Sequence, residues 1–295
     1  MKPSVIGIGV QKCMTSWIHA LAGAHPGIVA STPKEVDFFS YYFDRGYQWY
    51  EGHFQPKGAD AVGFESSPSY FHDPRAPERL AAYRPDARVI LLLRDPVERA
   101  YSNHLHEVVK GHIPPRPFAE GLANNPAYVE QGLYATHVAR WLDWFPRERM
   151  LILVAEEIVG DLEGAARRTY DFFGVDPEHR SGVLGEKRND SDTARFPLLR
   201  NTLRLGGDAL RRAGLEEALI KAKRLPPIQA ALRYNSVPAR DLVPPLSAED
   251  RARMTELFAP ETERLAALLG RAELPWATWR HGAGARGAEA GRMAG

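Results

Sequence analysis

The sequence predicts a doubly wound α/β fold, in which helices cover both faces of a central parallel sheet. Short apolar runs recur between the N-terminus and Gly174, helical patterns lie between them, and the runs are apolar at consecutive rather than alternate positions. Such runs are typical of strands that are buried on both faces. Alternation of strands with helices is typical of a parallel sheet.

Five apolar runs are the candidate strands, and the run Arg-Val-Ile-Leu-Leu-Leu at 88–93 is the clearest of them. The expected strands are residues 4–10, 28–30, 61–65, 88–93 and 150–154. The helices expected from the spacing of apolar positions are residues 15–23, 74–83, 95–110, 133–145 and 161–173.

The chain changes character after Gly174. Residues 182–197 are polar and basic and predict a loop, whereas residues 198–225 have a basic, helical pattern. The stretch between the two Pro-Pro pairs that follow fits no single pattern. We expect 198–245 to be a helical insertion or lid.

Residues 247–270 predict an amphipathic helix or helix pair at the C-terminal side of the fold. Ser247 is its expected cap, with Asp250 at the third position of a capping box. We expect a single α/β domain over residues 1–280 and a disordered Gly/Ala/Arg-rich tail at 281–295.

The composition is that of an ordinary globular protein. Of the 295 residues, 44% are hydrophobic and 25% are charged, which excludes wholesale disorder, a collagen-like chain and a multi-span membrane protein. Lysine and arginine total 38 against 37 acidic residues. A net charge of +1 argues against a broad nucleic-acid-binding surface but allows a local anion site.

Cysteine content and the N-terminal sequence bear on the compartment. Cys13 is the one cysteine, which excludes an intrachain disulfide and a Cys-rich zinc site. The N-terminus lacks the pattern of a signal peptide, and no run reaches the roughly 18 apolar residues of a membrane span. We therefore expect a cytoplasmic protein with no stable membrane insertion and no nucleic-acid partner.

The turn after the first expected strand is a candidate anion site. A lysine, Lys12, and two hydroxyls, Thr15 and Ser16, lie where the chain enters a helix. Helix N-termini expose unpaired N–H groups and a partial positive charge. The order of residues differs from a Walker A motif, in which the lysine follows the glycines. The alternative is a plain strand-to-helix turn with Thr15 as its cap.

A second candidate anion site follows the fourth expected strand. Asp95 suits a helix cap and the proline after it suits the first helical position, so Arg94 lies at the carboxyl edge of a buried strand. Ser102 returns to the same face two turns later. The alternative is a structural ion pair of Arg94 with Asp95 or Glu98.

The two candidate sites, in this order, resemble those of the sulfotransferases that use 3′-phosphoadenosine 5′-phosphosulfate (PAPS). The resemblance implies a P-loop-like, three-layer α/β/α fold, PAPS as co-substrate, adenosine 3′,5′-bisphosphate (PAP) as product, and no metal. It implies that the 3′-phosphate is held by Arg94 and Ser102. The implied contacts of the 5′-phosphosulfate are Lys12, Cys13, Met14, Thr15, Ser16 and Trp17.

Further stretches resemble the heparan-sulfate branch of that family. Residues 32–39, which include Lys-Glu-Val-Asp-Phe-Phe, resemble its Lys-Glu-x-x-Phe-Phe segment, and residues 64–71 resemble its next motif. The glutamate of that segment is the catalytic base of the branch, which implies this role for Glu35. The resemblance covers about residues 4–197 and 246–280.

Several positions depart from the family pattern. Met14 stands where the phosphosulfate loop usually has glycine, and Ser66 stands where the heparan branch has a lysine. The segment 187–197 lacks the usual Gly-Arg pair, which leaves Arg188 and Arg195 as its expected phosphate contacts. The membrane anchor and the disulfide of the Golgi members have no counterpart in this sequence.

The resemblance implies an in-line transfer of the sulfuryl group to a hydroxyl or amine. Lys12 and the N–H groups of residues 13–17 would stabilise the negative charge that grows on the leaving phosphate. Glu35 would take the acceptor proton, and the alternative is an ordinary carboxylate at the start of a helix. We expect Lys34 to contact substrate or support structure rather than take part in the chemistry.

Other residue types could carry parts of this chemistry. The histidines in the same part of the sequence are alternative bases, although their flanking residues do not match the branch that uses a histidine: His19, His25, His53, His72, His104, His106 and His137. Cys13 lies where a helix N-terminus lowers thiol pKa values, so it could be catalytic or sensitive to oxidation.

Aromatic residues are candidates for binding adenine and the acceptor. Trp17, Tyr134 and Phe196 are the candidates for stacking on adenine. The aromatic stretch 41–50 follows Glu35 closely, and it could form the acceptor pocket or simply a packed helix.

Three other functions compete with the sulfotransferase. A kinase-like nucleotide enzyme would share a related fold, but it needs a Gly-Lys-Ser/Thr loop. A PAPS-binding module without catalysis would fit the substitutions at Met14 and Ser66. A nucleic-acid binder would use the Arg-rich stretches 200–224 and 233–240, against the near-zero net charge. For the sulfotransferase we expect a small-molecule, glycoside or lipid-headgroup acceptor.

Overall fold

The computed structural model describes residues 1–55, 58, 60–185, 192–194 and 236–279. The chain divides into two compact units. The first contains Met1–Asn103, Asn125–Arg188 and Ser247–Gly295, and the second contains His104–Asn124 and Asn189–Leu246. The expected contacts Arg188 and Arg195, the aromatic Phe196, the tail 281–295 and most of the inserted segment lie outside the described residues.

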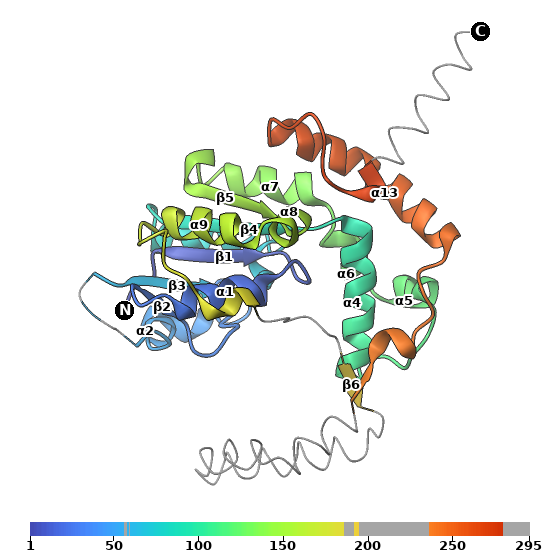
Figure 1. Cartoon of the computed structure of the whole chain (residues 1–295), viewed down its shortest axis with the longest axis horizontal. Helices are drawn as coiled ribbons and strands as arrows, with labels where there is room; N and C mark the ends of the chain where they lie inside the picture. Colours follow the sequence, from blue (N-terminus) through green and yellow to red (C-terminus); the bar gives the residue numbers. More distant parts are fainter. Residues whose placement is uncertain (56–57, 59, 186–191, 195–235, 280–295) are drawn as a thin grey trace. The chain divides into compact units, whose positions relative to one another are not determined.

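The first unit is built on a five-stranded parallel sheet in the order β2-β3-β1-β4-β5 (Figure 1). Its strands are β1 (Val5–Gly9), β2 (Ile28–Ala30), β3 (Val62–Ser66), β4 (Arg88–Leu93) and β5 (Met150–Val154). All five expected strands are confirmed, and each bound lies within one residue of the expected one. The fold is therefore the α/β fold that the sequence predicts.

The strand order reverses direction between β1 and β4. The connection after β1 leads to β2 on one side of it, and the connection after β4 leads to β5 on the other side. In open parallel sheets, the carboxyl ends of two strands whose connections diverge in this way form the usual binding crevice. The residues that follow Gly9 and Leu93 lie at that point.

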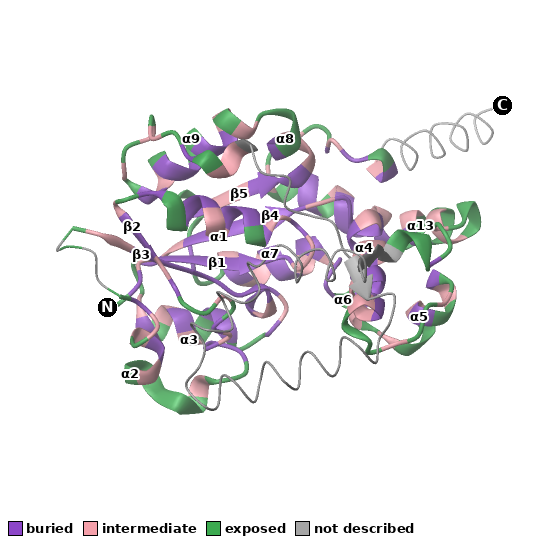
Figure 2. Cartoon of the chain, turned by 60° about the horizontal axis from the view of Figure 1, so that its bottom comes forward, coloured by how far each residue is buried: buried purple, intermediate pink, exposed green. Residues whose placement is uncertain are grey.

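Helices cover both faces of the sheet, so its strands are buried (Figure 2). Side chains alternate between the two faces along β3. Phe64 packs on Phe173 of α9 (Leu162–Phe173), and the next residue, Glu65, meets Tyr50 of α2 (Gly46–Glu51) on the opposite face. On the first face, the Tyr170 hydroxyl of α9 donates to the Leu21 carbonyl of α1 (Thr15–Ala24) at 3.1 Å.

The remaining expected helices are also confirmed. They are α3 (Ala76–Tyr83), α4 (Pro96–Lys110) and α7 (Tyr134–Leu142). The C-terminal segment, expected as one helix or two, is the single helix α13 (Ala248–Leu268) with Pro260 inside it. Ser247 caps α13 as expected, because its hydroxyl accepts from the Asp250 N–H at 2.9 Å.

Several short elements were missing from the prediction. The segment expected to be a loop includes β6 (Asp192–Ala194), which pairs antiparallel with β7 (Ser236–Pro238) in the second unit, so the loop prediction was wrong there. The missed helices are α5 (Phe118–Asn124), α6 (Ala127–Glu130), α8 (Ala155–Gly160) and α2. The short 3-10 turns are Phe43–Arg45, Pro68–Tyr70, Arg147–Arg149, Gly182–Gly185 and Ala239–Asp241.

Candidate active site

The loop between β1 and α1 leaves the N-terminus of α1 open. Met14 precedes the helix with φ 66°, in the left-handed region, and no side chain caps the helix. Thr15 is the first helical residue, so the alternative in which it is the cap is wrong. The N–H groups of Met14, Thr15 and Ser16 have no acceptor within the described residues. Consecutive unpaired N–H groups at a helix N-terminus bind anions.

The ends of the same loop are closed by internal hydrogen bonds. The Cys13 N–H donates to the Val10 carbonyl at 3.1 Å, and the Trp17 N–H donates to the Met14 carbonyl at 2.9 Å. The expected set of anion-binding N–H groups, residues 13–17, therefore narrows to the three between them. Lys12, with φ 70°, is partly buried, and Ser16 is exposed.

Cys13 is a core residue rather than a reactive thiol. Its side chain is fully buried, and its sulfur lies 3.9 Å from the hydroxyl of Tyr134. Burial raises the pKa of the thiol to about 12, while the nearby Arg99 and Arg94 lower it to a smaller extent. The expectation of a lowered thiol pKa at this helix N-terminus was wrong, because desolvation outweighs the nearby cations.

The aromatic candidates for adenine stacking are buried where they are described. Trp17 is 4% exposed and Tyr134 is fully buried, so neither presents a free ring face. The aromatic side chains of residues 41–50 differ in their burial. Tyr50 is buried and stacked on Phe38, with ring centroids 4.6 Å apart, whereas Tyr41 and Tyr42 are exposed.

Arg94 follows β4 at the carboxyl edge of the sheet with its guanidinium unpaired. It forms no ion pair or hydrogen bond with the side chains of the described residues, so the alternative of an ion pair with Asp95 or Glu98 is wrong. Asp95 caps α4 by accepting from the Val97 N–H at 2.9 Å, and Glu98 pairs with Arg251 at 2.6 Å. Ser102 lies partly buried on α4, with no hydrogen bond of its side chain to the described residues.

A second buried arginine adds positive charge close to this edge. Arg99 is fully buried, and it donates to the amide oxygen of Gln131 at 3.2 Å and to the carbonyl of Tyr128. Its Nε has no partner, and no carboxylate pairs with it in the described part of the chain. Burial lowers the pKa of this guanidinium. The sequence reasoning missed Arg99, and its place one turn after Asp95 was the available signal.

The loop that carries Glu35 approaches the open helix terminus. The Lys34 Nζ lies 3.1 Å from the Glu35 Oε1 and donates to the Thr15 Oγ1 at 3.5 Å. The Glu35 side chain is 40% exposed. Residues 34–37 are not helical, so the alternative of a helix-start carboxylate is wrong. Lys34 therefore links Glu35 to the first residue of α1.

Glu65 supports the loop that carries Glu35 through a chain of hydrogen bonds that passes through Ser67. Its carboxylate is fully buried and accepts from Tyr50 at 3.2 Å and from the Ser67 hydroxyl at 2.8 Å. The Ser67 Oγ in turn accepts from the backbone N–H groups of Val36 and Asp37, at 3.2 and 2.9 Å. Burial raises the pKa of Glu65 to about 7, although its hydrogen bonds act in the opposite direction.

Asp37 is a second carboxylate that sequence reasoning did not select. It has φ 53° and accepts a 2.5 Å hydrogen bond from Ser69, whose oxygen lies 2.7 Å from that of Ser40. Burial raises the pKa of Asp37. Its position two residues after Glu35 was the feature of the sequence that could have identified Asp37 as part of the site.

The histidines have structural partners in most cases. Burial, and then the Lys34 charge, lower the pKa of His19 to about 4, and its ring lies 3.2 Å from the Ser31 carbonyl. The rings of His53, His104 and His137 likewise lie within 3.2 Å of backbone carbonyls. Among the residues described, no group of three histidine, cysteine or acidic side chains could hold a metal ion.

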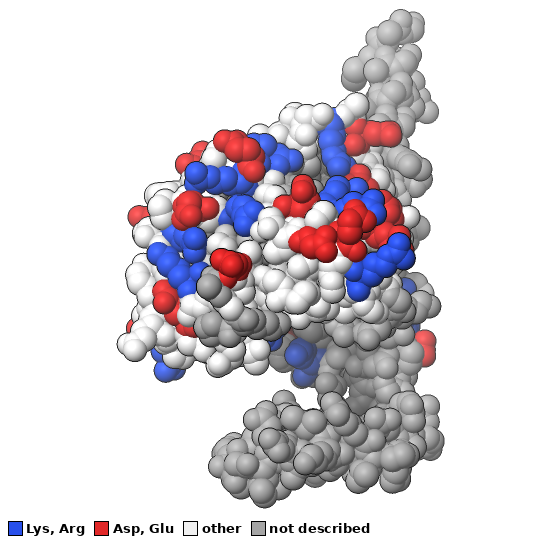
Figure 3. All heavy atoms as spheres, turned by 60° about the vertical axis from the view of Figure 1, so that its left-hand side comes forward, with Lys and Arg blue, Asp and Glu red and all other residues white. Residues whose placement is uncertain are grey.

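The distribution of surface charge and the hydropathy of the helices bear on whether the protein has a nucleic-acid or a membrane partner. On the face in Figure 3, basic and acidic side chains of the described residues are interspersed, and neither sign forms a continuous patch. No helix in the described ranges is long and apolar enough to cross a membrane.

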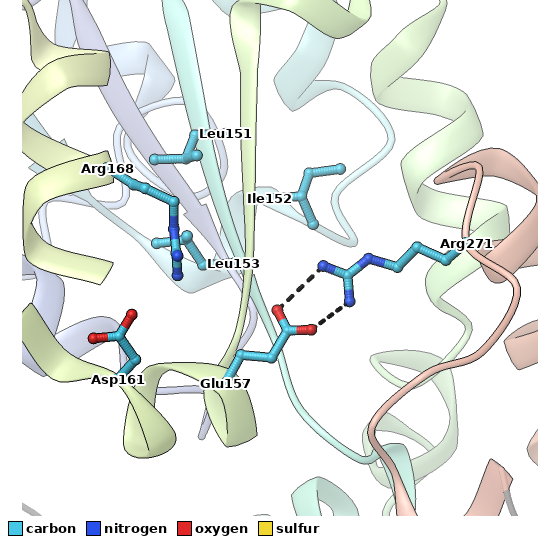
Figure 4. A pocket seen from close by; sticks show the side chains of 7 residues that line it. All are labelled: Leu151, Ile152, Leu153, Glu157, Asp161, Arg168 and Arg271. Carbon is cyan, nitrogen blue, oxygen red and sulfur yellow. Dashed lines mark hydrogen bonds and ion pairs between the residues drawn. The ribbon is translucent and has the colours of Figure 1, made fainter. Parts of the chain in front are cut away.

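A cavity of about 480 Å³ lies away from this site, beside the edge strand β5 (Figure 4). It is lined by residues of β5, by Asp161 and Arg168, and by the pair of Glu157 with Arg271. That pair is bidentate, with distances of 2.6 and 3.1 Å. None of the expected site residues lines this cavity.

Comparison with known proteins identifies relatives of the sequence. Heparan sulfate glucosamine 3-O-sulfotransferase 6 of Mus musculus is 33% identical over 183 residues, which are 59% of this chain and 52% of that protein. The 3-O-sulfotransferase 3B1 of Homo sapiens, also named for heparan sulfate glucosamine, is 33% identical over 184 residues, 59% of this chain and 46% of that protein. The chain thus spans about half the length of these curated relatives.

A solved structure and a family model agree with this likeness. The crystal structure of a sulfotransferase from Alicyclobacillus acidocaldarius has the same fold, with a TM-score of 0.68 at 22% identity, over 95% of this chain and 99% of that one. The family model described as "Sulfotransferase domain" matches residues 2–191. Since this match covers more than half of the chain, the protein belongs to the sulfotransferase domain family.

Proposed function

We propose that this chain transfers a sulfuryl group from PAPS to a hydroxyl or amine of a small-molecule, glycoside or lipid-headgroup acceptor. The observation that carries the proposal is the pairing of two open anion sites at adjacent strand ends. Three unpaired N–H groups follow β1, and the unpaired guanidinium of Arg94 follows β4, its neighbour in the sheet. Family membership supports the same reading.

The co-substrate would span the two sites. The N–H groups of Met14, Thr15 and Ser16, together with Lys12, would hold the 5′-phosphosulfate. Arg94, through its bidentate fork, and Ser102 would hold the 3′-phosphate. The buried charge of Arg99 favours an anion at this edge of the sheet.

The chemistry is a displacement at sulfur. The acceptor oxygen or nitrogen forms a bond to sulfur while the bond from sulfur to the 5′-phosphate oxygen breaks, and PAP leaves with the electron pair of that bond. Glu35 takes the proton of the acceptor, since its carboxylate is exposed and is paired with Lys34, which contacts Thr15 at the start of α1. The donors at the helix terminus stabilise the charge that grows on the 5′-phosphate.

The acceptor would approach from the side of Glu35. Tyr41 and Tyr42 are exposed there, and the carboxylates of Asp37 and Glu35 contribute to the raised pKa of Tyr41, after its partial burial. Exposed aromatic faces suit sugar rings and apolar scaffolds. The relatives compared above are named for heparan sulfate glucosamine, which is a carbohydrate acceptor.

Calorimetric titration with PAP tests the proposal without knowledge of the acceptor. We expect micromolar binding of PAP, a loss of roughly 10- to 100-fold in Arg94→Ala, and no binding of ATP. Arg168→Ala is the matched control, because Arg168 is exposed on α9 and is not among the expected cofactor contacts. Magnesium-dependent binding of ATP in place of PAP would favour the kinase-like alternative, and absence of any binding would overturn the proposal.

A further inference from the structure

The ammonium group of Lys34 lies between the two centres of the proposed reaction. It is 3.1 Å from the carboxylate of Glu35 and 3.5 Å from the hydroxyl of Thr15, the first residue of α1. The Lys34 side chain is only 17% exposed, so its charge is held in place rather than free in solvent. A single cation therefore faces the proposed base and the proposed phosphosulfate site together.

The donors of Lys34 leave room for a ligand. An ammonium group has three N–H donors, and the described residues use two of them. The contact with Thr15 is at the long end of the hydrogen-bond range, so an anionic oxygen at the helix terminus would compete with it successfully. Lys34 thus has one free N–H donor and one weakly used N–H donor for an anion that binds to the N–H groups of α1.

The charge of Lys34 also acts at α1. After burial, Lys34 is the next largest contribution to the lowered pKa of His19 on that helix, so its positive charge is felt at α1.

The sequence led us to expect no part for Lys34 in the chemistry, but on these contacts we propose that Lys34 binds the sulfuryl group of PAPS during transfer, which makes it a catalytic residue of the proposed reaction. The inference rests on the proposed function. Lys34 would donate to a sulfuryl oxygen while the acceptor–sulfur bond forms and the bond to the 5′-phosphate breaks. The acceptor proton goes to Glu35, whose neutralisation loosens its pairing with Lys34. The freed charge then stays with the new sulfate ester until the product leaves.

PAPS and PAP differ by the sulfuryl group, so their binding separates this role from a structural one. We would titrate both into wild type, Lys34→Met, Lys34→Arg and Glu35→Gln, with Lys110→Met as the control at an exposed lysine. Thermal unfolding of each variant checks that it is folded. We expect Lys34→Met to weaken PAPS about tenfold or more and PAP less than twofold. Lys34→Arg keeps the positive charge, so we expect it to keep most of the affinity for PAPS. We expect Glu35→Gln to bind PAPS at least as tightly as wild type.

The outcomes are distinct. An equal loss of PAPS and PAP affinity in Lys34→Met would mean that Lys34 only supports the loop, and unchanged affinity for both would mean that it does not contact the ligand. Either result overturns the inference and leaves the proposed function intact. If wild type binds neither ligand, the proposed function fails, and the role of Lys34 fails with it.

Discussion

The hydroxyl of Tyr134 donates a 2.9 Å hydrogen bond to the backbone carbonyl of Arg94. The same oxygen lies 3.9 Å from the sulfur of Cys13, so one buried side chain of α7 contacts the loop after β1 and the residue after β4. One buried residue therefore links the two candidate anion sites.

Tyr134→Phe should loosen this link without creating a cavity. The variant leaves the Arg94 carbonyl without its donor, and we expect a loss of about 1–3 kcal/mol in the free energy of unfolding and weaker binding of PAP. Urea unfolding and calorimetry measure the two effects. Tyr42→Phe is the control, because Tyr42 is exposed. Full stability and full PAP affinity in Tyr134→Phe would show that the link does not matter.

Glu65 should make the stability depend on pH. Its pKa of about 7 in the folded chain lies above its ordinary value of 4.5, so the folded state holds the proton more tightly than the unfolded state. The stabilisation is fully present below pH 4.5 and is lost as the pH rises through 7. At about 1.4 kcal/mol for each pH unit between the two values, the loss approaches roughly 3–4 kcal/mol.

Urea unfolding of wild type and Glu65→Gln from pH 5 to pH 8 measures this effect. The glutamine cannot ionise, so we expect its free energy of unfolding to fall less over this range than that of wild type. The comparison is of the slopes, since Gln also loses one of the two acceptor interactions. Glu256→Gln, at an exposed position of α13, should follow wild type. Parallel curves for wild type and Glu65→Gln would contradict the prediction.

Cys13 should resist thiol reagents in the folded protein. With a thiol pKa of about 12, its thiolate fraction at pH 8 is far below that of an ordinary cysteine, and its side chain is not accessible. We expect labelling by dithiobis(nitrobenzoate) to be at least about 100-fold slower in the native protein than in denaturant. Rapid labelling of the native protein would mean that the loop after β1 opens readily.

Met14→Gly should be tolerated and mildly stabilising. A non-glycine residue at φ 66° costs about 1–2 kcal/mol, which glycine avoids, while glycine loses about 1 kcal/mol of backbone entropy on folding. We expect a net gain of up to about 1 kcal/mol in urea unfolding, with PAP affinity unchanged. Met14→Ala keeps the backbone strain, so it should show no gain. A glycine variant less stable than the alanine variant would contradict this account.

The sequence predicted the sheet well because its strands are short, continuous apolar runs. β2, β4 and β5 begin and end at the expected residues. The helix α8 was missed because it follows β5 without a loop, and α2 because its six residues are too few for a helical period.

The site was harder to predict than the fold, because its key contacts join distant parts of the chain. The residue types at Arg94 and Glu35 pointed to the site, but the freedom of Arg94 from ion pairs depends on where Glu98 and Asp95 find other partners. Likewise, the contact of Lys34 with Thr15 and the support of the Glu35 loop by Glu65 depend on the order of β1 and β3 in the sheet.

Glu35→Gln should separate binding from catalysis. Glutamine has the shape of glutamate but cannot accept the acceptor proton, so we expect PAPS to bind while the rate of PAP release falls by about 10²–10⁴. The rate is measured with an acceptor found by screening phenols, sugars and amines. Asp37→Asn is the matched control, because Asp37 is the neighbouring carboxylate and is already bonded to Ser69. We expect it to lose less than about tenfold. If Asp37→Asn loses more activity than Glu35→Gln, the base is Asp37, and an unchanged rate in both variants would place the base outside this loop.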